Sequence, residues 1–335
     1  ATTSMKVIVA ANTDISDATI KGTAGNADAN YTIDIATDAD AITMTRAQHA
    51  LLGTVNDGAD AVITLSDAGS TTGNASVGKY VLADGDQTFT LGAASQNVTT
   101  GSGAVVIDTG AIADITDAAL DGSAATTSMK VIVAANTDIS DAIIKGTAGN
   151  ADANYTIDIA TDADAITMTI AQNALLGTVN DGGDAVITLS NAGSVTSNGD
   201  IGKYILAAGG GTTILLSDDD LNVDTGGDGD TIDVAGRTAT GRFNTVAGDT
   251  IKLSNNANIA GVAGEAGAAG AILDANNLTL VNDASVTMTA EQNNGFGGNI
   301  VADGAETITL SNAVSATGRA NIETYVLADG DQTFT

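Results

Sequence analysis

The chain of 335 residues contains no cysteine, no proline and no tryptophan. Without cysteine it forms neither a disulfide nor a thiolate metal site, whatever its compartment. With only five tyrosines and four phenylalanines, the core must consist of aliphatic and small side chains, which predicts a narrow, layered core. Because proline removes a donor from a β-ladder, its absence favours an architecture of stacked strands.

Positive charge is also scarce, since 11 lysines and arginines face 41 aspartates and glutamates and the formal net charge is −30. Phosphate backbones and anionic lipids repel such a chain, so we expect no nucleic-acid partner and no membrane insertion. No run approaches the ~18 consecutive apolar residues of a membrane span. Hydrophobic residues make up 43% of the chain, which is enough to build a core and argues against disorder.

A long repeat organises the sequence. The string ATTSMKVIVAANTDISDA begins at Ala1 and again at Ala125, a period of 125 − 1 = 124 residues, and few positions differ over most of the matched length. A third, more diverged copy contains VTMTAEQ, which aligns with ITMTRAQ of the first copy. We therefore divide the chain into repeat blocks 1–124, 125–248 and 249–335. The last block stops at YVLADGDQTFT, a string that continues in the first block, so we expect the repeat to continue in a longer parent or in the next subunit.

A shorter repeat lies inside the first. QTFTLG begins at Gln87 and QNVTTG at Gln96, a step of 96 − 87 = 9 residues, and VVIDTG keeps that step. Apolar and polar residues alternate in each run, and Gly, Asn and Asp between the runs supply turns, which predicts short strands. The inward-facing candidates are Phe89, Val98, Ile107 and Ile115.

These features predict an all-β chain folded as a parallel β-solenoid, a β-helix or β-roll of stacked short strands. Tandem antiparallel β-sandwich modules are the alternative, because one module of ~100 residues or more would account for one 124-residue block. The string TRAQHALLG, which begins at Thr45, has the spacing of one or two helical turns.

Aspartates beside glycine recur in the turns between strands. Hard carboxylate oxygens on a flexible backbone suit Ca²⁺, which takes six to eight oxygen ligands, and bound cations would relieve the repulsion among unbalanced negative charges. Ordinary solvated Asp-Gly turns are the other interpretation. The candidate metal ligands are Asp57, Asp60, Asp84, Asp86, Asp181, Asp184, Asp228, Asp230, Asp329 and Asp331.

The string TGGDGDTIDV resembles the glycine-rich calcium-binding nonapeptide of RTX proteins, G-G-x-G-x-D-x-U-x. Gly226, Gly227 and Gly229 fill its three glycine positions. The acidic residue falls one place early, at Asp230, and Thr231 stands at the sixth position. We therefore expect no regular ladder of RTX sites.

Catalytic groups are few. His49 is the only histidine, and Asn173 takes its place in the second block, so we expect a surface histidine and no zinc site or catalytic triad. The carboxylates lie in repeated turns and not in one cleft, which argues against a glycosidase. Two remote alternatives are a polysaccharide-acting β-helix enzyme, for which Arg237 and Arg242 would be the residues to consider, and an ice-binding protein with outward threonine rows.

The Thr-, Asp-, Gly- and Asn-rich composition, the nested repeats and the near-RTX string together resemble the giant repeat proteins of bacterial cell surfaces: S-layer proteins, large secreted adhesins and extracellular fibre proteins. The resemblance implies export, an extracellular or cell-surface location, calcium-assisted folding, and assembly or attachment. Open edge strands predict end-to-end association into a homopolymer, with a non-catalytic structural role. The alternative is a calcium-dependent adhesin in which this segment forms the stalk and the protein contacts a cell surface or polysaccharide.

Overall fold

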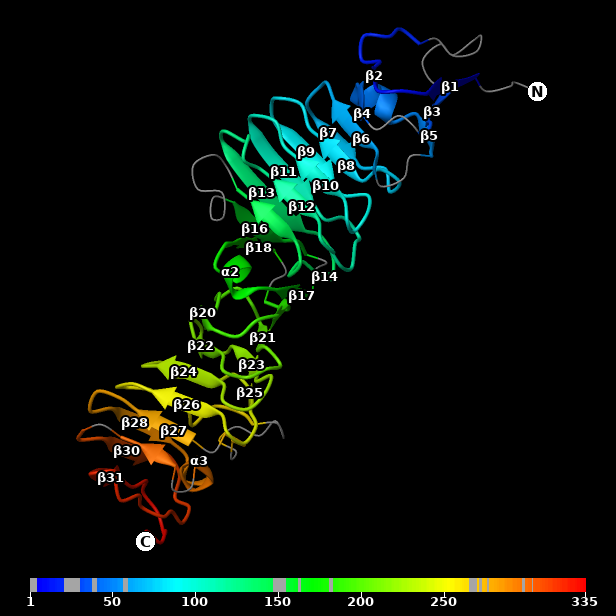
Figure 1. Cartoon of the computed structure of the whole chain (residues 1–335). Coiled ribbons are helices and arrows are strands. Elements are labelled where there is room, and N and C mark those ends of the chain that lie inside the picture. Colours follow the sequence, from blue (N-terminus) through cyan, green and yellow to red (C-terminus); the bar gives the residue numbers. More distant parts are fainter. Residues whose placement is uncertain are drawn as a thin grey trace. The chain divides into compact units, whose positions relative to one another are not determined.

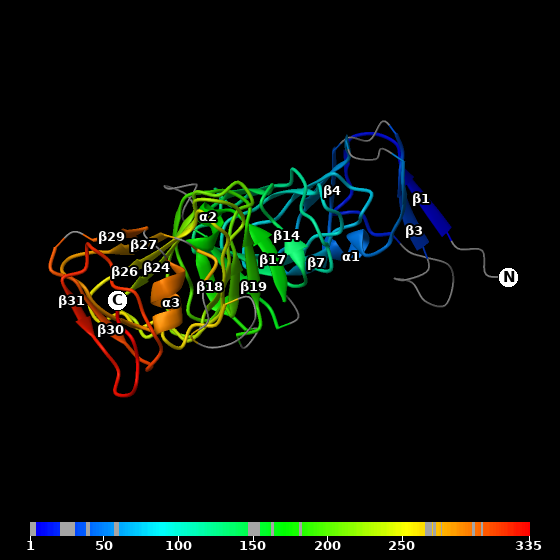
Figure 2. The same cartoon turned by 90° about the horizontal axis from the view of Figure 1, so that it is seen from below.

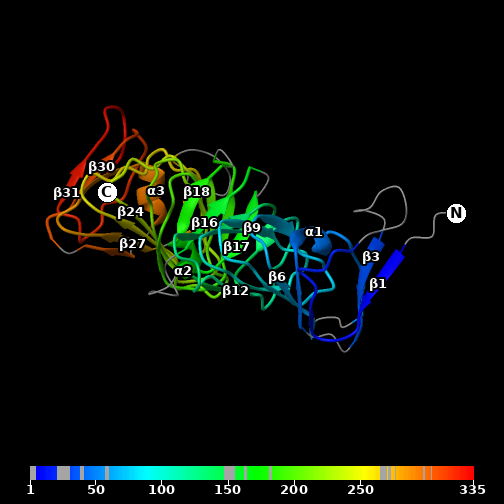
Figure 3. The same cartoon turned by 90° about the horizontal axis from the view of Figure 1, so that it is seen from above.

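The computed structural model describes every residue except 1–4, 21–30, 38–40, 57–59, 147–154, 162–163, 181–182, 265–269, 271–272, 276, 297–298 and 303. The fold is nearly all-β, with 5% helix, and its parallel sheets stack as a β-solenoid of about 13 turns. Every strand pairing recorded in the described part is parallel, as between β1 (Met5–Val9) and β3 (Tyr31–Ile35), which lie side by side in Figures 2 and 3. The solenoid prediction is confirmed, and the tandem antiparallel sandwiches are excluded.

The chain divides into two compact units, Ala1–Ala163 with Leu175–Asn180 and Asp164–Ala174 with Asp181–Thr335. The division falls within the second repeat block. None of the helices among the described residues is long and apolar enough to cross a membrane.

Unit 1 contains three parallel sheets, with strand orders β1-β3-β5, β15-β12-β10-β8-β6-β4-β2 and β18-β16-β13-β11-β9-β7. Figure 1 shows its strands stacked in order along the chain, from blue to green. Its further elements are β2 (Thr13–Asp14), β4 (Ala41–Met44), α1 (Arg46–His49), β5 (Leu52–Val55), β6 (Val62–Leu65), β7 (Ser70–Thr72), β8 (Lys79–Val81), β9 (Gln87–Thr90), β10 (Asn97–Thr99), β11 (Ala104–Asp108), β12 (Ala119–Asp121), β13 (Ser128–Val133), β14 (Thr137–Asp138), β15 (Ile143–Lys145), β16 (Thr156–Ile159) and β18 (Leu176–Val179).

Unit 2 repeats this arrangement, with the parallel strand orders β17-β19-β21-β23-β25, β20-β22-β24-β26-β27-β29 and β28-β30-β31. Its elements are β17 (Ala165–Met168), α2 (Ile170–Asn173), β19 (Val186–Leu189), β20 (Ser194–Thr196), β21 (Lys203–Ile205), β22 (Thr213–Leu215), β23 (Asn222–Asp224), β24 (Thr231–Ala235), β25 (Phe243–Asn244), β26 (Thr250–Leu253), β27 (Asn277–Leu280), β28 (Ser285–Met288), α3 (Ala290–Gly295), β29 (Ile300–Val301), β30 (Thr307–Leu310) and β31 (Thr324–Val326).

The nine-residue period places consecutive strands in different sheets. Val98 of β10 pairs with Tyr80 of β8, a step of 98 − 80 = 18 residues, whereas β9 and β11 pair in the other sheet. Where the period is regular, one coil therefore contains two strands and two turns. At one such turn, a Cβ added to Gly92 would lie 2.1 Å from the Gly73 carbonyl oxygen of the neighbouring coil, so only glycine lets these turns stack.

The core is a stack of inward side chains. The four predicted inward residues, Phe89, Val98, Ile107 and Ile115, are at most 1% exposed, which confirms the alternation seen in the sequence. Each lies over its counterpart in the next coil, as Phe89 does with Ile107. Truncating one such side chain to alanine costs about 2–5 kcal/mol.

Candidate functional site

The predicted calcium ligands Asp84 and Asp86 bind the backbone of the next coil. Asp84 Oδ1 accepts the N–H of Ser102 at 2.9 Å, and Asp86 Oδ1 accepts the N–H of Ala104 at 3.0 Å. The backbone and side-chain hydrogen bonds of Ser102 lower the pKa of Asp84. Both carboxylates are exposed, and each joins two successive coils.

Asp230, from the near-RTX string, is fully buried. Its Oδ1 accepts the N–H of Thr212 at 2.7 Å, its Oδ2 accepts the N–H of Gly226 at 3.0 Å, and its own N–H donates to Asp249 Oδ1 at 3.0 Å. Asp249, also buried, accepts the N–H of Val246 at 2.8 Å through Oδ2. Asp230, the acidic residue of the near-RTX string, therefore links backbone groups of adjacent turns.

The structure describes five of the seven other predicted ligands. Asp57 and Asp181 lie outside the described residues. The described part of the chain contains no group of three or more acidic or histidine side chains placed to hold a metal ion, so the predicted ligands do not form a preassembled cage there. Calcium binding stays a prediction. The candidates that are exposed and have no recorded side-chain bond are Asp60, Asp184, Asp228, Asp329 and Asp331.

Lysines bind aspartates across neighbouring coils. Lys130 Nζ lies 2.6 Å from Asp158 Oδ2, and Lys252 Nζ lies 2.7 Å from Asp233 Oδ2. The lysines are partly exposed, so each pair contributes only about 0–1 kcal/mol. Their placement nevertheless offsets some of the repulsion between stacked acidic rows.

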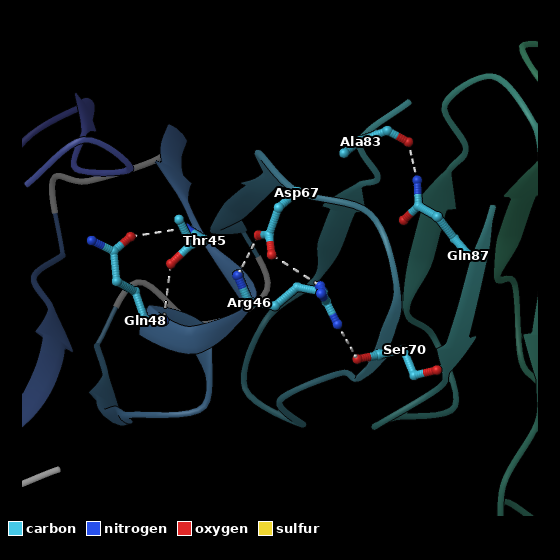
Figure 4. Close-up of polar contacts among 7 residues, drawn as sticks. All are labelled: Thr45, Arg46, Gln48, Asp67, Ser70, Ala83 and Gln87. Carbon is cyan, nitrogen blue, oxygen red and sulfur yellow. Dashed lines mark hydrogen bonds and ion pairs between the residues drawn. The ribbon is translucent and has the colours of Figure 1, made fainter. Parts of the chain in front are cut away.

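A short helical turn follows a strand in each repeat block. In α1, Thr45 caps the helix by accepting the N–H of Gln48 at 3.2 Å, and Gln48 Oε1 accepts the N–H of Thr45 at 2.8 Å (Figure 4). The same reciprocal capping box begins α2 and α3 and satisfies backbone donors that the helix start would leave free. The helical turn predicted from TRAQHALLG is confirmed.

A tyrosine hydroxyl ties the helical turn to a later loop in the second and third blocks. In the second block, Tyr204 donates to Asn173 Oδ1 at 2.9 Å and accepts the N–H of Asn198 at 3.0 Å. In the third block, Tyr325 donates to Asn293 Oδ1 at 3.2 Å. Burial raises the pKa of Tyr204 to about 12, so the hydroxyl keeps its proton.

In the first block this place is taken by His49, which is 7% exposed. The surface histidine expected from the sequence is therefore wrong: the imidazole replaces a buried asparagine amide. Its Nε2 lies 2.7 Å from the Tyr80 hydroxyl, which also accepts the N–H of Asn74 at 2.8 Å. Burial lowers the pKa of His49 to about 4. Because the equivalent tyrosines donate, we assign Tyr80 as donor to Nε2, which places the ring proton of the neutral imidazole on Nδ1.

A cavity of about 400 Å³ opens beside His49 in unit 1. Arg46 lies along its wall, where Nε is 3.1 Å from Asp67 Oδ2 and Nη1 donates to the Ser70 carbonyl oxygen at 3.3 Å (Figure 4). Composition and spacing do not predict this cavity. The signal in the sequence is that Arg46 and His49 are among the few positions at which residues 1–74 differ from residues 125–198.

The arginines considered for a polysaccharide-acting enzyme are bound to the preceding coil. Arg237 donates through Nε to the Leu216 carbonyl oxygen at 2.9 Å, and its Nη1 lies 3.5 Å from Asp219 Oδ1. The backbone N–H of Arg242 donates to Asn222 Oδ1 at 2.9 Å. These contacts stabilise the turns.

No protein-family model matches the chain, no curated protein matches it, and no solved structure matches it.

Proposed function

We propose that the chain is a non-catalytic structural protein of the bacterial cell surface or extracellular matrix, which assembles with copies of itself into a fibre or layer. The observation that carries the proposal is the open edge of β1, compared with its duplicate in the second block. The extracellular location rests on the acidic, cysteine-free and threonine-rich composition.

Strands β1 and β13 share the sequence MKVIV, but their surroundings differ. β13 lies between β11 and β16, and Met129 pairs with Val105 of β11. There Met129 is 2% exposed, whereas its duplicate Met5 in β1 is 36% exposed. The same residues that a parallel coil covers in the second block are thus uncovered in the first.

In the described part of the chain, the backbone of β1 also lacks a neighbouring strand on the side that corresponds to the β11 side of β13. β1 is the edge strand of its described sheet and pairs with β3 alone. In β13, Ile132 faces β11, where its carbonyl accepts the N–H of Thr109 at 2.9 Å. Its duplicate Ile8 is 62% exposed. Unpaired backbone groups on a regular edge are a template for a further strand.

The occupant that we propose for this edge is a coil of a second copy of the chain. A parallel coil of this same sequence type already covers β13, so the edge accepts the geometry that the chain itself supplies. The chain also carries a second sheet edge at β31, with Val326 and Leu327 more than 40% exposed. Contact between two different edges is heterologous, and such contact continues into a filament unless it closes.

A matched pair of proline substitutions tests the proposal. Ile8→Pro removes an N–H from the open edge, because the N–H and C=O of a strand residue point to the same side, and it should abolish assembly while leaving the melting temperature close to that of the wild type. Ile132→Pro places the same change inside a ladder and should destabilise unit 1 by ~3 kcal/mol or more. Sedimentation velocity reports assembly. Assembly of Ile8→Pro like that of the wild type would refute the role of β1, and a wild type that stays monomeric would favour the adhesin stalk.

A further inference from the structure

We infer that the cavity beside His49 binds a neutral, hydroxyl-rich saccharide unit. This is a ligand site in addition to the structural role, and it does not depend on assembly. The cavity lies entirely within the first repeat block, between α1 and the segment that contains β7.

Over residues 1–74, the positions at which the first block differs from its duplicate gather at the cavity. Four of the differing positions line the cavity, and a fifth, Asp67, binds Arg46. Of the two that remain, Thr19 is not among the lining residues, and Ala59 lies outside the described residues. Aligned at the 124-residue period, residues 1–74 differ from 125–198 at Thr19, Arg46, His49, Ala59, Asp67, Thr71 and Gly73.

At two of the lining positions the first block has the polar residue and the second block an apolar one. Where it has Arg46 and Thr71, the second block has Ile170 and Val195. Val195 is 6% exposed and packs as a core residue. The third block aligns Ala316 with Thr71. A solenoid coil thus packs well with apolar residues at these positions, so the polar set of the first block is not required by the fold.

One polar atom of a cavity-lining residue also lacks a hydrogen bond. Thr71 Oγ1 is buried and has no hydrogen-bond partner in the structure. In the second block, by contrast, Ser197 Oγ lies 2.8 Å from Ser217 Oγ, and Asn173 bonds both Tyr204 and the Thr196 carbonyl oxygen. A buried polar group without a partner destabilises the folded state. Thr71 is among the lining residues, so a rotation of its side chain would let the hydroxyl bond a ligand in the cavity.

The charges select the ligand class. The Arg46 guanidinium is paired with Asp67, burial keeps the His49 ring neutral at neutral pH, and the chain carries a net charge of −30, so an anion gains little here. No carboxylate lines the cavity, which disfavours a cation. An apolar ligand would leave the Thr71 hydroxyl unpaired. A neutral ligand with many hydroxyls is the remaining class.

The shape and lining suit one small saccharide unit. The volume of about 400 Å³ lies near the lower end of the range of about 300–1,000 Å³ for ligand pockets. Sugar hydroxyls both donate and accept hydrogen bonds, and the hydroxyl-bearing residues Ser70, Thr71 and Thr72 are among the lining residues. Ala50 and Leu52 add an apolar patch, against which the C–H groups of a sugar ring can pack.

The test uses the only histidine of the full chain as its reporter. Methyl α-glucopyranoside, methyl α-mannopyranoside, methyl α-galactopyranoside and methyl β-glucuronide are titrated into the protein, while NMR follows the ring nitrogens of His49. At least one neutral glycoside should shift these signals saturably. No saturable shift with any neutral glycoside would overturn the proposal, and tighter binding of the glucuronide would overturn the neutral class.

The second block supplies the control variants. The triple variant Arg46→Ile, His49→Asn and Thr71→Val introduces the residues that the second block has at these positions. Because these residues fold there, the variant should fold. Calorimetry should show ligand binding weakened about tenfold or more, the equivalent of ~1.4 kcal/mol. Thr19→Ile also introduces the residue of the second block, but at a position that is not among the lining residues. This control variant should bind the ligand like the wild type. A triple variant that binds as tightly as the wild type would overturn the assignment.

Discussion

His49 Nε2 lies 2.7 Å from the Tyr80 hydroxyl oxygen, where the second and third blocks place the Oδ1 atoms of Asn173 and Asn293. A neutral imidazole and an amide thus accept the same tyrosine proton. The two differ in one property that matters for stability, because only the imidazole titrates near neutral pH.

The stability of the chain should therefore depend on pH through His49. Burial lowers its pKa in the folded chain to about 4, whereas an unfolded histidine has a pKa of about 6.5. Between these values the unfolded chain binds more protons, so the free energy of unfolding should fall as the pH decreases, by up to ~1.4 kcal/mol per pH unit. Urea unfolding at several pH values between these limits measures this, and His49→Asn should lose that dependence. Identical pH profiles for the two proteins would contradict the prediction.

The tyrosine hydroxyl of the second block should contribute measurably to stability. Tyr204→Phe leaves Asn173 Oδ1 and the N–H of Asn198 without their partner, which should cost about 1–3 kcal/mol. A double-mutant cycle with Asn173→Ala isolates the pair, because the two residues are in direct contact. Additive losses in urea unfolding would show that the hydroxyl and the amide act independently.

Asp230 should be far more important to folding than its neighbour Asp228. Asp230→Ala removes two acceptors from buried backbone N–H groups and should destabilise unit 2 by about 2–5 kcal/mol. Asp228→Ala changes an exposed side chain and should stay within ~0.5 kcal/mol of the wild type. The comparison is made in EDTA, so that any metal effect is absent. Equal losses in the two variants would contradict the structural role of Asp230.

Calcium binding by the exposed Asp-Gly turns, predicted from the sequence, implies a lower melting temperature after chelation. Circular dichroism melts in EDTA, in calcium and in magnesium measure this, and magnesium controls for charge screening because it demands stricter octahedral geometry. An unchanged melting curve in EDTA would remove calcium from the account.

Much of the fold is legible in the sequence because a solenoid has few independent parts. The alternation in QTFT and AVVID places Phe89 and Ile107 in the core, and the absence of proline agrees with uninterrupted ladders. The strand period, however, does not say how many strands complete one coil. Whether the coil contains two strands depends on the turn geometry around residues such as Gly92, which only the stacked structure shows.

The site was less predictable, for a physical reason. An Asp-Gly pair has the same composition whether its carboxylate binds a cation or a backbone N–H, and Asp230 does the latter. His49 looks like a surface residue in the sequence because its hydrogen-bond partner, the Tyr80 hydroxyl, lies 31 positions further along the chain. The sequence indicates the cavity only when the first two blocks are compared, because several lining residues are ones at which the first block differs from the second.

The most direct test of the central claim is electron microscopy of the purified chain, as wild type and as Ile8→Pro, at matched concentrations. The open edge of β1 predicts filaments or a lattice for the wild type and separate particles for the variant. Separate particles for both proteins, or filaments in both, would contradict assembly through that edge.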